Sequence, residues 1–291
     1  MEIQKLDELK KLLSAEEKEE DDRIMYMHEV AEITREEYNF TRYKTGIHPI
    51  DEALKQSSKD DGGISGGEIM IIAGPTGNGK TLLASTIAYN LMRENGLPCA
   101  YFSYEVNIYS LWNSFKLMGA TDKDLFCVPF KNTTGNIEWI EKKIIEAKKK
   151  FMAKVIVIDH LGFLAPKQKM GGNMQANYSV YLTQIVRELK NLAQQQDVII
   201  ILPAHVNKSS GSEPSMKDIS HSGGIAQESD VVLMIAREEN KENTNNYYTK
   251  FSKVFMAKNR IGENTPMLFM EKTAGKLVET VKTNDNTERA Y

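Results

Sequence analysis

The chain has 291 residues, of which 41% are apolar and 26% are charged, and its formal net charge is −3. These values are typical of an ordinary soluble globular protein with one large domain and an appendage. They exclude a globally basic chain, so any nucleic-acid binding must come from locally concentrated basic groups. No apolar run approaches the ~20 residues of a membrane span, and the acidic N-terminus is unlike a signal peptide. We therefore expect a cytoplasmic protein with no membrane partner.

Residues 1–41 differ in pattern from the rest of the chain. Apolar residues recur at helical spacing from Ile3 to Leu13, an acidic run follows, and a second apolar set ends at Ile33. The pattern predicts two short helices without a core of their own, and the acidic run is expected to be a solvated face. The apolar stripe must pack on its own domain or on a neighbouring subunit. We interpret residues 1–41 as a helical extension and linker in contact with a subunit.

Residues 42–281 alternate between strand and helix patterns and form the predicted main domain, followed by a polar tail over residues 282–291. The strands are short and nearly all apolar, as are strands buried on both faces of a parallel sheet. They are predicted at Ile69–Ala73, Cys99–Tyr104, Phe126–Pro129, Val155–Ile158, Val198–Leu202 and Val231–Ala236, with helices at Thr81–Asn95, Ile137–Phe151 and Ser179–Gln196. This alternation predicts an α/β fold with a doubly wound, mostly parallel sheet.

The C-terminal part of this domain lacks helical patterns. Phe251–Lys258, Met267–Glu271 and Lys276–Thr280 are predicted to be antiparallel strands that complete the sheet.

The segment from Gly74 to Thr81, between a predicted strand and a predicted helix, matches the phosphate-binding pattern GxxxxGK[ST]. Its glycines let successive backbone N–H groups point at a phosphate, and the helix adds its positive N-terminal end. Lys80 is expected to reach the β- and γ-phosphates, and the Thr81 hydroxyl to ligate Mg²⁺. The alternative is a glycine-rich turn without a ligand. We predict binding and hydrolysis of ATP with Mg²⁺, and the nucleotide-binding set is Gly74, Thr76, Gly77, Asn78, Gly79, Lys80, Thr81 and Leu82.

Two acidic residues follow apolar strands. Asp159 ends the strand pattern VIVI and is predicted to hold Mg²⁺ through water, with a turn signal as the alternative. The next residue is His160 rather than glutamate, so the base that activates water must come from elsewhere. Glu105 closes a strand that is expected to lie beside the phosphate-loop strand, where its carboxylate can reach an in-line water. A helix-capping glutamate is the alternative.

His205 ends the apolar strand VIIILPAH. A polar residue at this edge of a parallel sheet faces the crevice where ligands bind, so His205 is predicted to bond the γ-phosphate and sense its loss. An ordinary surface or core histidine, as His160 and His221 could also be, is the alternative.

In this order the motifs resemble those of the RecA-like motor domain of ring-shaped replicative DNA helicases of the DnaB type, over roughly residues 42–281. YFSYE resembles the family's strand with its catalytic glutamate, and VIVIDHLGFL its Walker B strand. VYLTQIVRELKNLAQQQDVIIILPAHVNK is similar to the helix, strand and sensor unit, and its histidine is closer to phage and mitochondrial members than to bacterial ones. FMAKNRIG resembles the K-x-R segment, which implies that Lys258 and Arg260 reach a neighbouring subunit's ATP site. A solvated turn arginine is the alternative for Arg260.

SMKDISHSGGIAQESDVVLMIAR resembles the family's DNA-contacting loop, but Ser220 and His221 stand where the family often has an arginine and an acid. Phosphate contacts would then come from backbone N–H groups near Gly223 and Gly224, or from flanking lysines. A second polar segment, residues 165–177, either faces the central channel or is a surface loop. The lysines in or near these two regions that are assigned to DNA are Lys167, Lys169, Lys208 and Lys217.

The resemblance implies an ATP-driven helicase motor that translocates on single-stranded DNA as a homo-oligomeric, hexameric ring. A primase or polymerase would be supplied by separate chains, because only about 40 residues precede the motor domain. The alternative is a RecA-superfamily ATPase that is not a helicase, such as a recombination mediator, a loader or a nucleotide-switched accessory ring.

Overall fold

The computed structural model describes residues 26–28, 41–57, 60–131, 136–164, 174–206, 223–239, 248–263 and 267–280. The chain divides into two units, Met1–Thr41 and Arg42–Tyr291, and the fold below is that of the second. In the first unit Met27 and His28 are helical, and the two helices expected there otherwise lie outside the described residues. Within the described ranges, no helix combines the length and the apolar character that a membrane crossing requires.

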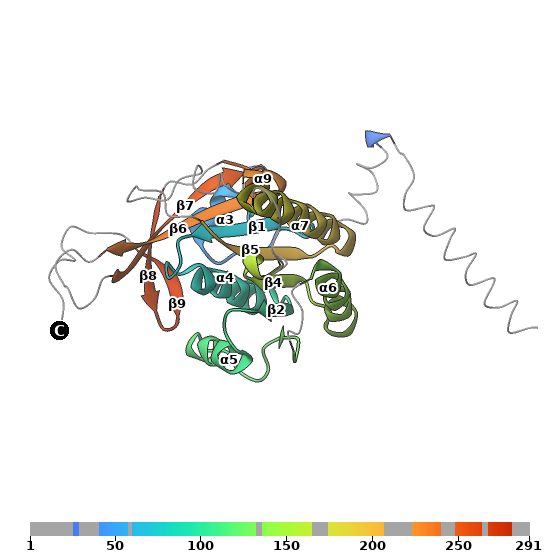
Figure 1. Cartoon of the computed structure of the whole chain (residues 1–291). Coiled ribbons are helices and arrows are strands. Elements are labelled where there is room, and N and C mark those ends of the chain that lie inside the picture. Colours follow the sequence, from blue (N-terminus) through green and yellow to red (C-terminus); the bar gives the residue numbers. More distant parts are fainter. Residues whose placement is uncertain are drawn as a thin grey trace, which may run out of the picture. The chain divides into compact units, whose positions relative to one another are not determined.

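Strands and helices alternate through most of the second unit, as Figure 1 shows. In chain order the elements are α3 (His48–Ala53), β1 (Ile69–Gly74), α4 (Lys80–Asn95), β2 (Cys99–Ser103), α5 (Ile108–Leu117), β3 (Phe126–Cys127), α6 (Ile137–Phe151), β4 (Val155–Asp159), the 3₁₀ turn η1 (Leu161–Leu164), α7 (Met174–Gln196), β5 (Ile199–His205), α9 (Gly223–Glu228), β6 (Val231–Glu239), β7 (Tyr248–Asn259), β8 (Leu268–Thr273) and β9 (Lys276–Thr280).

In the part of the chain that the structure describes, nine strands form one sheet in the order β3-β2-β4-β5-β1-β6-β7-β8-β9. The pairs from β3 to β6 are parallel, and those from β6 to β9 are antiparallel. The predicted fold class, a mostly parallel sheet with antiparallel strands at its C-terminal end, is therefore confirmed.

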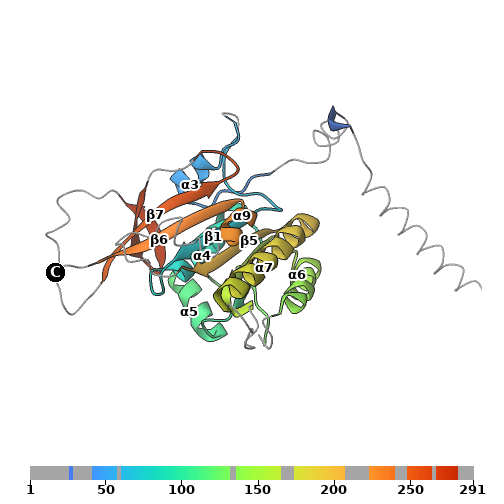
Figure 2. The same cartoon turned by 45° about the horizontal axis from the view of Figure 1, so that its top comes forward.

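Each face of the sheet has its own apolar core. In β1, Met70 and Ile72 join the core under α3, α4 and α5, whereas Ile69 and Ile71 join the core under α6, α7 and α9. The alternation follows from the two-residue period of a strand, and both layers of helices are visible in Figures 1 and 2. Because the central strands are covered on both sides, their polar residues can meet solvent only at the strand ends.

Three expectations from the sequence are wrong in detail. The strand that ends before Glu105 is not a neighbour of the phosphate-loop strand, because β4 and β5 lie between β2 and β1. Local apolar patterns carry no information on strand order, which the later crossovers set. Helix α7 begins at Met174, so residues 174–177 are helical rather than part of a loop. Helix α5 has no counterpart among the expected helices; its cap Asn107 accepts a hydrogen bond from Ser110 N, and only Leu111 and Phe115 on it are buried.

Candidate active site

The carboxyl ends of four parallel strands bring the predicted site residues to one edge of the sheet. In the strand register, Gly74 of β1 lies beside His205 of β5, and Ser103 of β2 lies beside Asp159 of β4. Glu105 follows β2 two residues later. Ligands of doubly wound sheets bind at this edge, so Glu105 reaches the site although its strand is not next to β1.

The phosphate loop turns sharply between β1 and α4. Gly77 and Gly79 have φ values of 77° and 96°, a conformation that favours glycine, and Gly79 is the N-cap of α4. The Lys80 ammonium donates to Pro75 O at 2.9 Å, and the Asn78 carboxamide accepts from Arg237 N on β6 at 2.7 Å. The first contact lies within the loop and the second holds the loop against β6, so its N–H groups are held before a phosphate arrives.

Thr81 and Asp159 meet behind this loop. The Thr81 hydroxyl donates to Asp159 Oδ1 at 3.3 Å, and the Tyr101 hydroxyl donates to Oδ2 at 3.3 Å. Tyr101 is itself bonded to Ser85 of α4 at 3.1 Å, and Asp159 is fully buried. Hydroxyl and carboxylate oxygens are the ligands that Mg²⁺ prefers, so these donors fit that ion.

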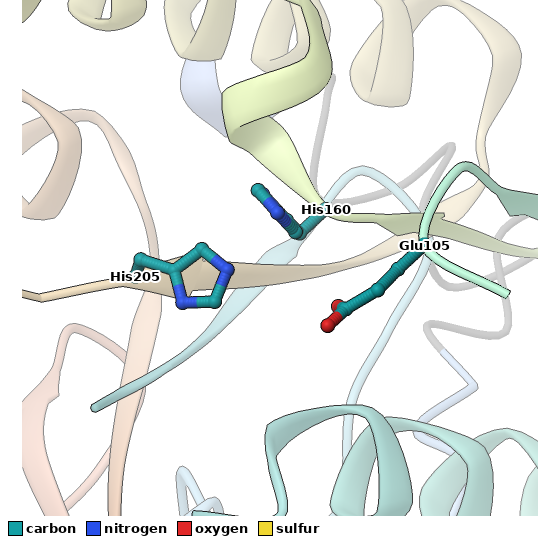
Figure 3. A group of neighbouring side chains, drawn as sticks. All are labelled: Glu105, His160 and His205. Carbon is teal, nitrogen blue, oxygen red and sulfur yellow. The ribbon is translucent and has the colours of Figure 1, made fainter. Parts of the chain in front are cut away.

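Glu105 and His205 extend toward each other from the ends of β2 and β5, and His160, directly after β4, lies beside them (Figure 3). One carboxylate oxygen and one nitrogen of each imidazole lie within 4.8 Å of one another. The two rings meet edge to face with centroids 4.1 Å apart, and His205 Nδ1 shares a hydrogen bond of 3.3 Å with the Thr76 hydroxyl. His160 thus belongs to the group, which sequence reasoning missed. Its position directly after Asp159 was the available signal.

Burial and neighbouring charges shift the pKa values of these groups. Burial lowers the pKa of Lys80 to about 8, against the opposing effect of Glu105 and Asp159. Burial also raises the pKa of Asp159 to about 6. The pKa of His160 falls to about 4 because of burial and the charges of His205 and Lys80, and that of His205 is lowered by burial and Lys80. Burial thus favours the neutral form of both imidazoles.

A cavity of about 350 Å³ extends from the phosphate loop toward α5 and the antiparallel strands. That volume lies in the range of small-molecule sites. Its lining includes Lys80, Thr81, Glu105 and His205, apolar Leu111 and Met118, and three cations from β6, β7 and β8, which are Arg237, Lys250 and Lys272. Sequence reasoning did not assign these three cations to the site. Arg237 ends the segment that resembles the family's DNA-contacting loop, and Lys250 and Lys272 belong to no recognised motif.

Lys258 and Arg260 lie at the opposite edge of the sheet. The Lys258 ammonium donates to Ala226 O, Gln227 O and Ser229 O at 2.6, 2.9 and 2.7 Å, at the end of α9. Burial and the nearby Arg260 guanidinium lower the pKa of Lys258. The Arg260 side chain is exposed and donates to Gln227 O, and its backbone N–H donates to Asp230 O at 2.9 Å. Neither cation lies in the cavity of its own chain.

Most residues assigned to DNA lie outside the described ranges, namely Lys167, Lys169, Lys208, Lys217, Ser220 and His221. Gly223 and Gly224 open α9. A Cβ at Gly224 would stand 2.2 Å from Thr183 Oγ1 of α7, so this glycine allows the two helices to pack closely. That packing accounts for Gly224 without a phosphate, and its contact with DNA stays a prediction.

The sequence profile of the DnaB-like helicase C-terminal domain matches residues 118–275, a span that begins after the phosphate loop and Glu105. A probable replicative DNA helicase of Trieres chinensis is 27% identical over 256 residues, which cover 75% of this chain and 52% of that protein. The chain thus spans about half the length of the curated relatives it matches.

Solved structures agree in fold. A solved ATPase domain superposes with a TM-score of 0.69 at 19% identity, covering 87% of this chain and 96% of that one. A DnaB-like replicative helicase, from a structure that reports its interactions with primase, gives 0.68 at 19% identity, covering 88% and 67%.

Proposed function

Because the chain belongs to the DnaB-like helicase C-terminal domain family, we propose that it is the ATP-driven motor of a replicative-type DNA helicase. The observation that carries this proposal is the meeting of Lys80, Thr81, Asp159, Glu105 and His205 at one sheet edge, around a cavity beside the phosphate loop. We propose that the motor works as a hexameric ring on single-stranded DNA.

ATP would bind with its phosphates in the loop from Gly74 to Thr81. The N–H groups of the loop and the start of α4 offer donors to the β-phosphate, and Lys80 supplies a positive charge. Thr81 and Asp159, 3.3 Å apart, would hold Mg²⁺, which when bound neutralises charge on the phosphates. The apolar side chains of Leu111 and Met118 in the cavity are placed to cover the nucleoside.

Hydrolysis needs a base that can accept a proton from the attacking water, and we assign this role to Glu105. The oxygen of a water molecule bonds to the γ-phosphorus, and its proton passes to the Glu105 carboxylate. The bond from the γ-phosphorus to the β–γ bridging oxygen breaks, and that oxygen keeps the electron pair as part of ADP. His205, next to Thr76 of the loop, would bond the γ-phosphate and respond to its release.

Lys258 and Arg260 are assigned to the ATP site of a neighbouring subunit. Arg260 N bonds to Asp230 O, and Asp230 Oδ2 accepts from Ile69 N at the start of β1. The phosphate loop follows the other end of β1, about 16 Å away at 3.3 Å per residue. A cation at that edge is too far away to act on the phosphate loop of its own chain, which supports the assignment in trans and an oligomeric protein.

The remaining assignments follow the family. Lys167, Lys169, Lys208 and Lys217 would line the DNA path, with Ser220, His221, Gly223 and Gly224 beside it. Residues 1–41 would contact a neighbouring subunit, residues 42–281 would form the motor, and residues 282–291 a polar tail. The structure of a similar DnaB-like helicase reports its interactions with primase. A primase or polymerase on a separate chain is therefore the proposed partner.

The test compares wild-type protein with Lys80→Ala and Lys142→Ala in ATP hydrolysis and in separation of a forked DNA duplex. Lys80→Ala should abolish both activities, because it removes the charge that stabilises the transferred phosphoryl group. Lys142, which is exposed on α6, should tolerate alanine. Hydrolysis by Lys80→Ala at the wild-type rate would overturn the proposal. Hydrolysis by wild type without strand separation would favour a RecA-superfamily ATPase that is not a helicase.

A further inference from the structure

His160 holds a fixed orientation beside the predicted base. Its Nδ1 accepts a hydrogen bond from Gly162 N at 3.0 Å, and its ring lies against Phe163 with centroids 4.8 Å apart. A Cβ at Gly162 would stand 2.8 Å from His160 Cε1, so glycine is needed for the imidazole to rest on this N–H group. The ring is held by its own turn, independently of any ligand.

The Gly162 contact selects one tautomer of His160. A nitrogen that accepts a hydrogen bond carries no proton, so the proton of the neutral ring must be on Nε2. His160 therefore has one N–H donor left to offer, and the side chains of Glu105 and His205 are its neighbours (Figure 3).

The spacing of the three groups suits one water molecule. One carboxylate oxygen and one nitrogen of each imidazole lie within 4.8 Å of one another, and within the described part of the chain no hydrogen bond joins the three side chains directly. Two hydrogen bonds of about 2.8 Å that meet at a near-tetrahedral angle place their outer atoms about 4.6 Å apart. A water between Glu105 and His160 can thus bond to both.

We propose that His160 is a water-positioning residue: its Nε2–H donates to the oxygen of the attacking water, while the Glu105 carboxylate accepts a proton from it. This inference rests on the proposed ATPase function. The donor occupies one lone pair of the water and the carboxylate orients one O–H bond, so the other lone pair is left to face the γ-phosphorus. His205 keeps its separate contact with Thr76.

A transition metal held by the same three groups fits less well. A ligating imidazole offers a nitrogen lone pair to the metal and donates its other N–H to the protein. His160 does the reverse, because the nitrogen with the lone pair already accepts from Gly162 N. Metal binding would require the other tautomer and would break this hydrogen bond.

The test uses two replacements of similar length, His160→Gln, which retains an N–H donor, and His160→Met, which has none. Both should bind a fluorescent ADP analogue as tightly as wild type, since Thr81, Lys80 and the loop are untouched. The kcat for ATP should fall roughly 10- to 100-fold in His160→Met, as is usual when a reactant loses its orientation, with KM unchanged. His160→Gln should recover most of the loss.

Equal kcat values in the Met and Gln variants would overturn the water-positioning role, as would parallel loss of ADP binding in both, which would make His160 structural. The tautomer gives a readout that needs no activity. In ¹⁵N spectra of the wild-type protein, which has five histidines, the signal removed by His160→Gln should show a protonated Nε2. A protonated Nδ1 would overturn the inference even if the protein hydrolyses ATP. Absence of ATP hydrolysis in wild type, with the expected tautomer, would instead reject the proposed function.

Discussion

The two edges of the parallel sheet are built differently. At the carboxyl edge, Lys80 and Thr81 line a cavity, and Asp159 accepts a hydrogen bond from Thr81 behind it. Lys80 also contacts the phosphate loop. At the amino edge, the hydrogen bonds of the Lys258 and Arg260 side chains within the described residues go to backbone carbonyls at the end of α9. One edge is thus arranged to receive a ligand, and the other presents cations held against a short helix. We expect this difference in a chain whose amino-edge cations complete the ATP site of a neighbouring subunit.

The largest expected effect tests whether the amino edge acts on another subunit. Arg260→Ala should leave nucleotide binding by isolated subunits intact and lower turnover in the assembly roughly 10³- to 10⁵-fold, the value of an arginine that stabilises phosphoryl transfer. Arg93→Ala, whose guanidinium pairs with Asp124 on the surface, should retain wild-type turnover. The measurements are steady-state ATPase and a nucleotide-binding titration.

A mixture of two inactive variants tests whether Arg260 acts on the ATP site of a neighbouring subunit. Inactive Arg260→Ala and inactive Lys80→Ala subunits should regain part of the activity together, because some interfaces then pair an intact phosphate loop with an intact arginine. A mixture that stays inactive despite verified co-assembly would contradict the assignment.

The second effect belongs to the carboxyl edge alone. Glu105→Gln should keep ATP binding and lower turnover by roughly 10²-fold or more, because the carboxamide cannot accept the proton of water. Single-turnover hydrolysis and nucleotide affinity measure the two quantities, with Glu141→Gln on the exposed face of α6 as the control. Parallel loss of binding and turnover would show that Glu105 is structural.

A smaller effect separates two roles of Lys258. Its ammonium neutralises the C-terminal end of α9 through three carbonyls, so Lys258→Met should lower the free energy of unfolding by about 1–2 kcal/mol. Urea denaturation measures this, and Lys123→Met, at an exposed position, should change it little. An unchanged unfolding free energy would contradict the stabilising role of Lys258 within its own chain.

The smallest effect concerns the lysines assigned to DNA in residues 165–173 and 207–222, which lie outside the described ranges. Alanine at Lys167, Lys169, Lys208 and Lys217 should make the salt dependence of single-stranded DNA binding less steep, by about 0.7 for each phosphate that is no longer neutralised. Fluorescence anisotropy of labelled oligo-dT at several salt concentrations measures the slope. Alanine at Lys142 and Lys149 of α6 is the control. An unchanged slope would place the DNA path on another surface.

Strong local patterns allowed much of the fold to be predicted. Ile137–Phe151 is helical over the predicted range, and β9 is also as expected, because amphipathic periodicity and turn residues act locally. Strand order was beyond reach, since buried strands such as β2 and β5 are equally apolar and their neighbours depend on the whole chain. For the same reason Glu105 was assigned a wrong neighbouring strand while its edge of the sheet was predicted.

Site residues could be predicted where a polar residue ends a buried strand or belongs to a specific sequence motif. Asp159 and His205 each end a buried strand, and the phosphate loop carries a specific pattern. Arg237, Lys250 and Lys272 line the cavity without any such sign, because they alternate with ordinary residues of the antiparallel strands. The hydrogen bonds of Lys258 within its own chain could not be predicted from the sequence either, because its partners are backbone carbonyls, which every residue has.

The strands β1, β6 and β7 run between the two edges and are paired side by side, Met70 with Val231 and Val232 with Lys258, with a register shift after Val232. Asn78 of the phosphate loop is also bonded to Arg237 N on β6. Such a hydrogen-bonded sheet is a stiff spacer, so the pocket and Arg260 keep a constant separation within one chain. In the proposed ring, an arginine could then approach or leave the next pocket only if its whole subunit rotates. Rotation of one rigid subunit would therefore open or complete the ATP site of the next subunit, and this would couple successive sites in the ring.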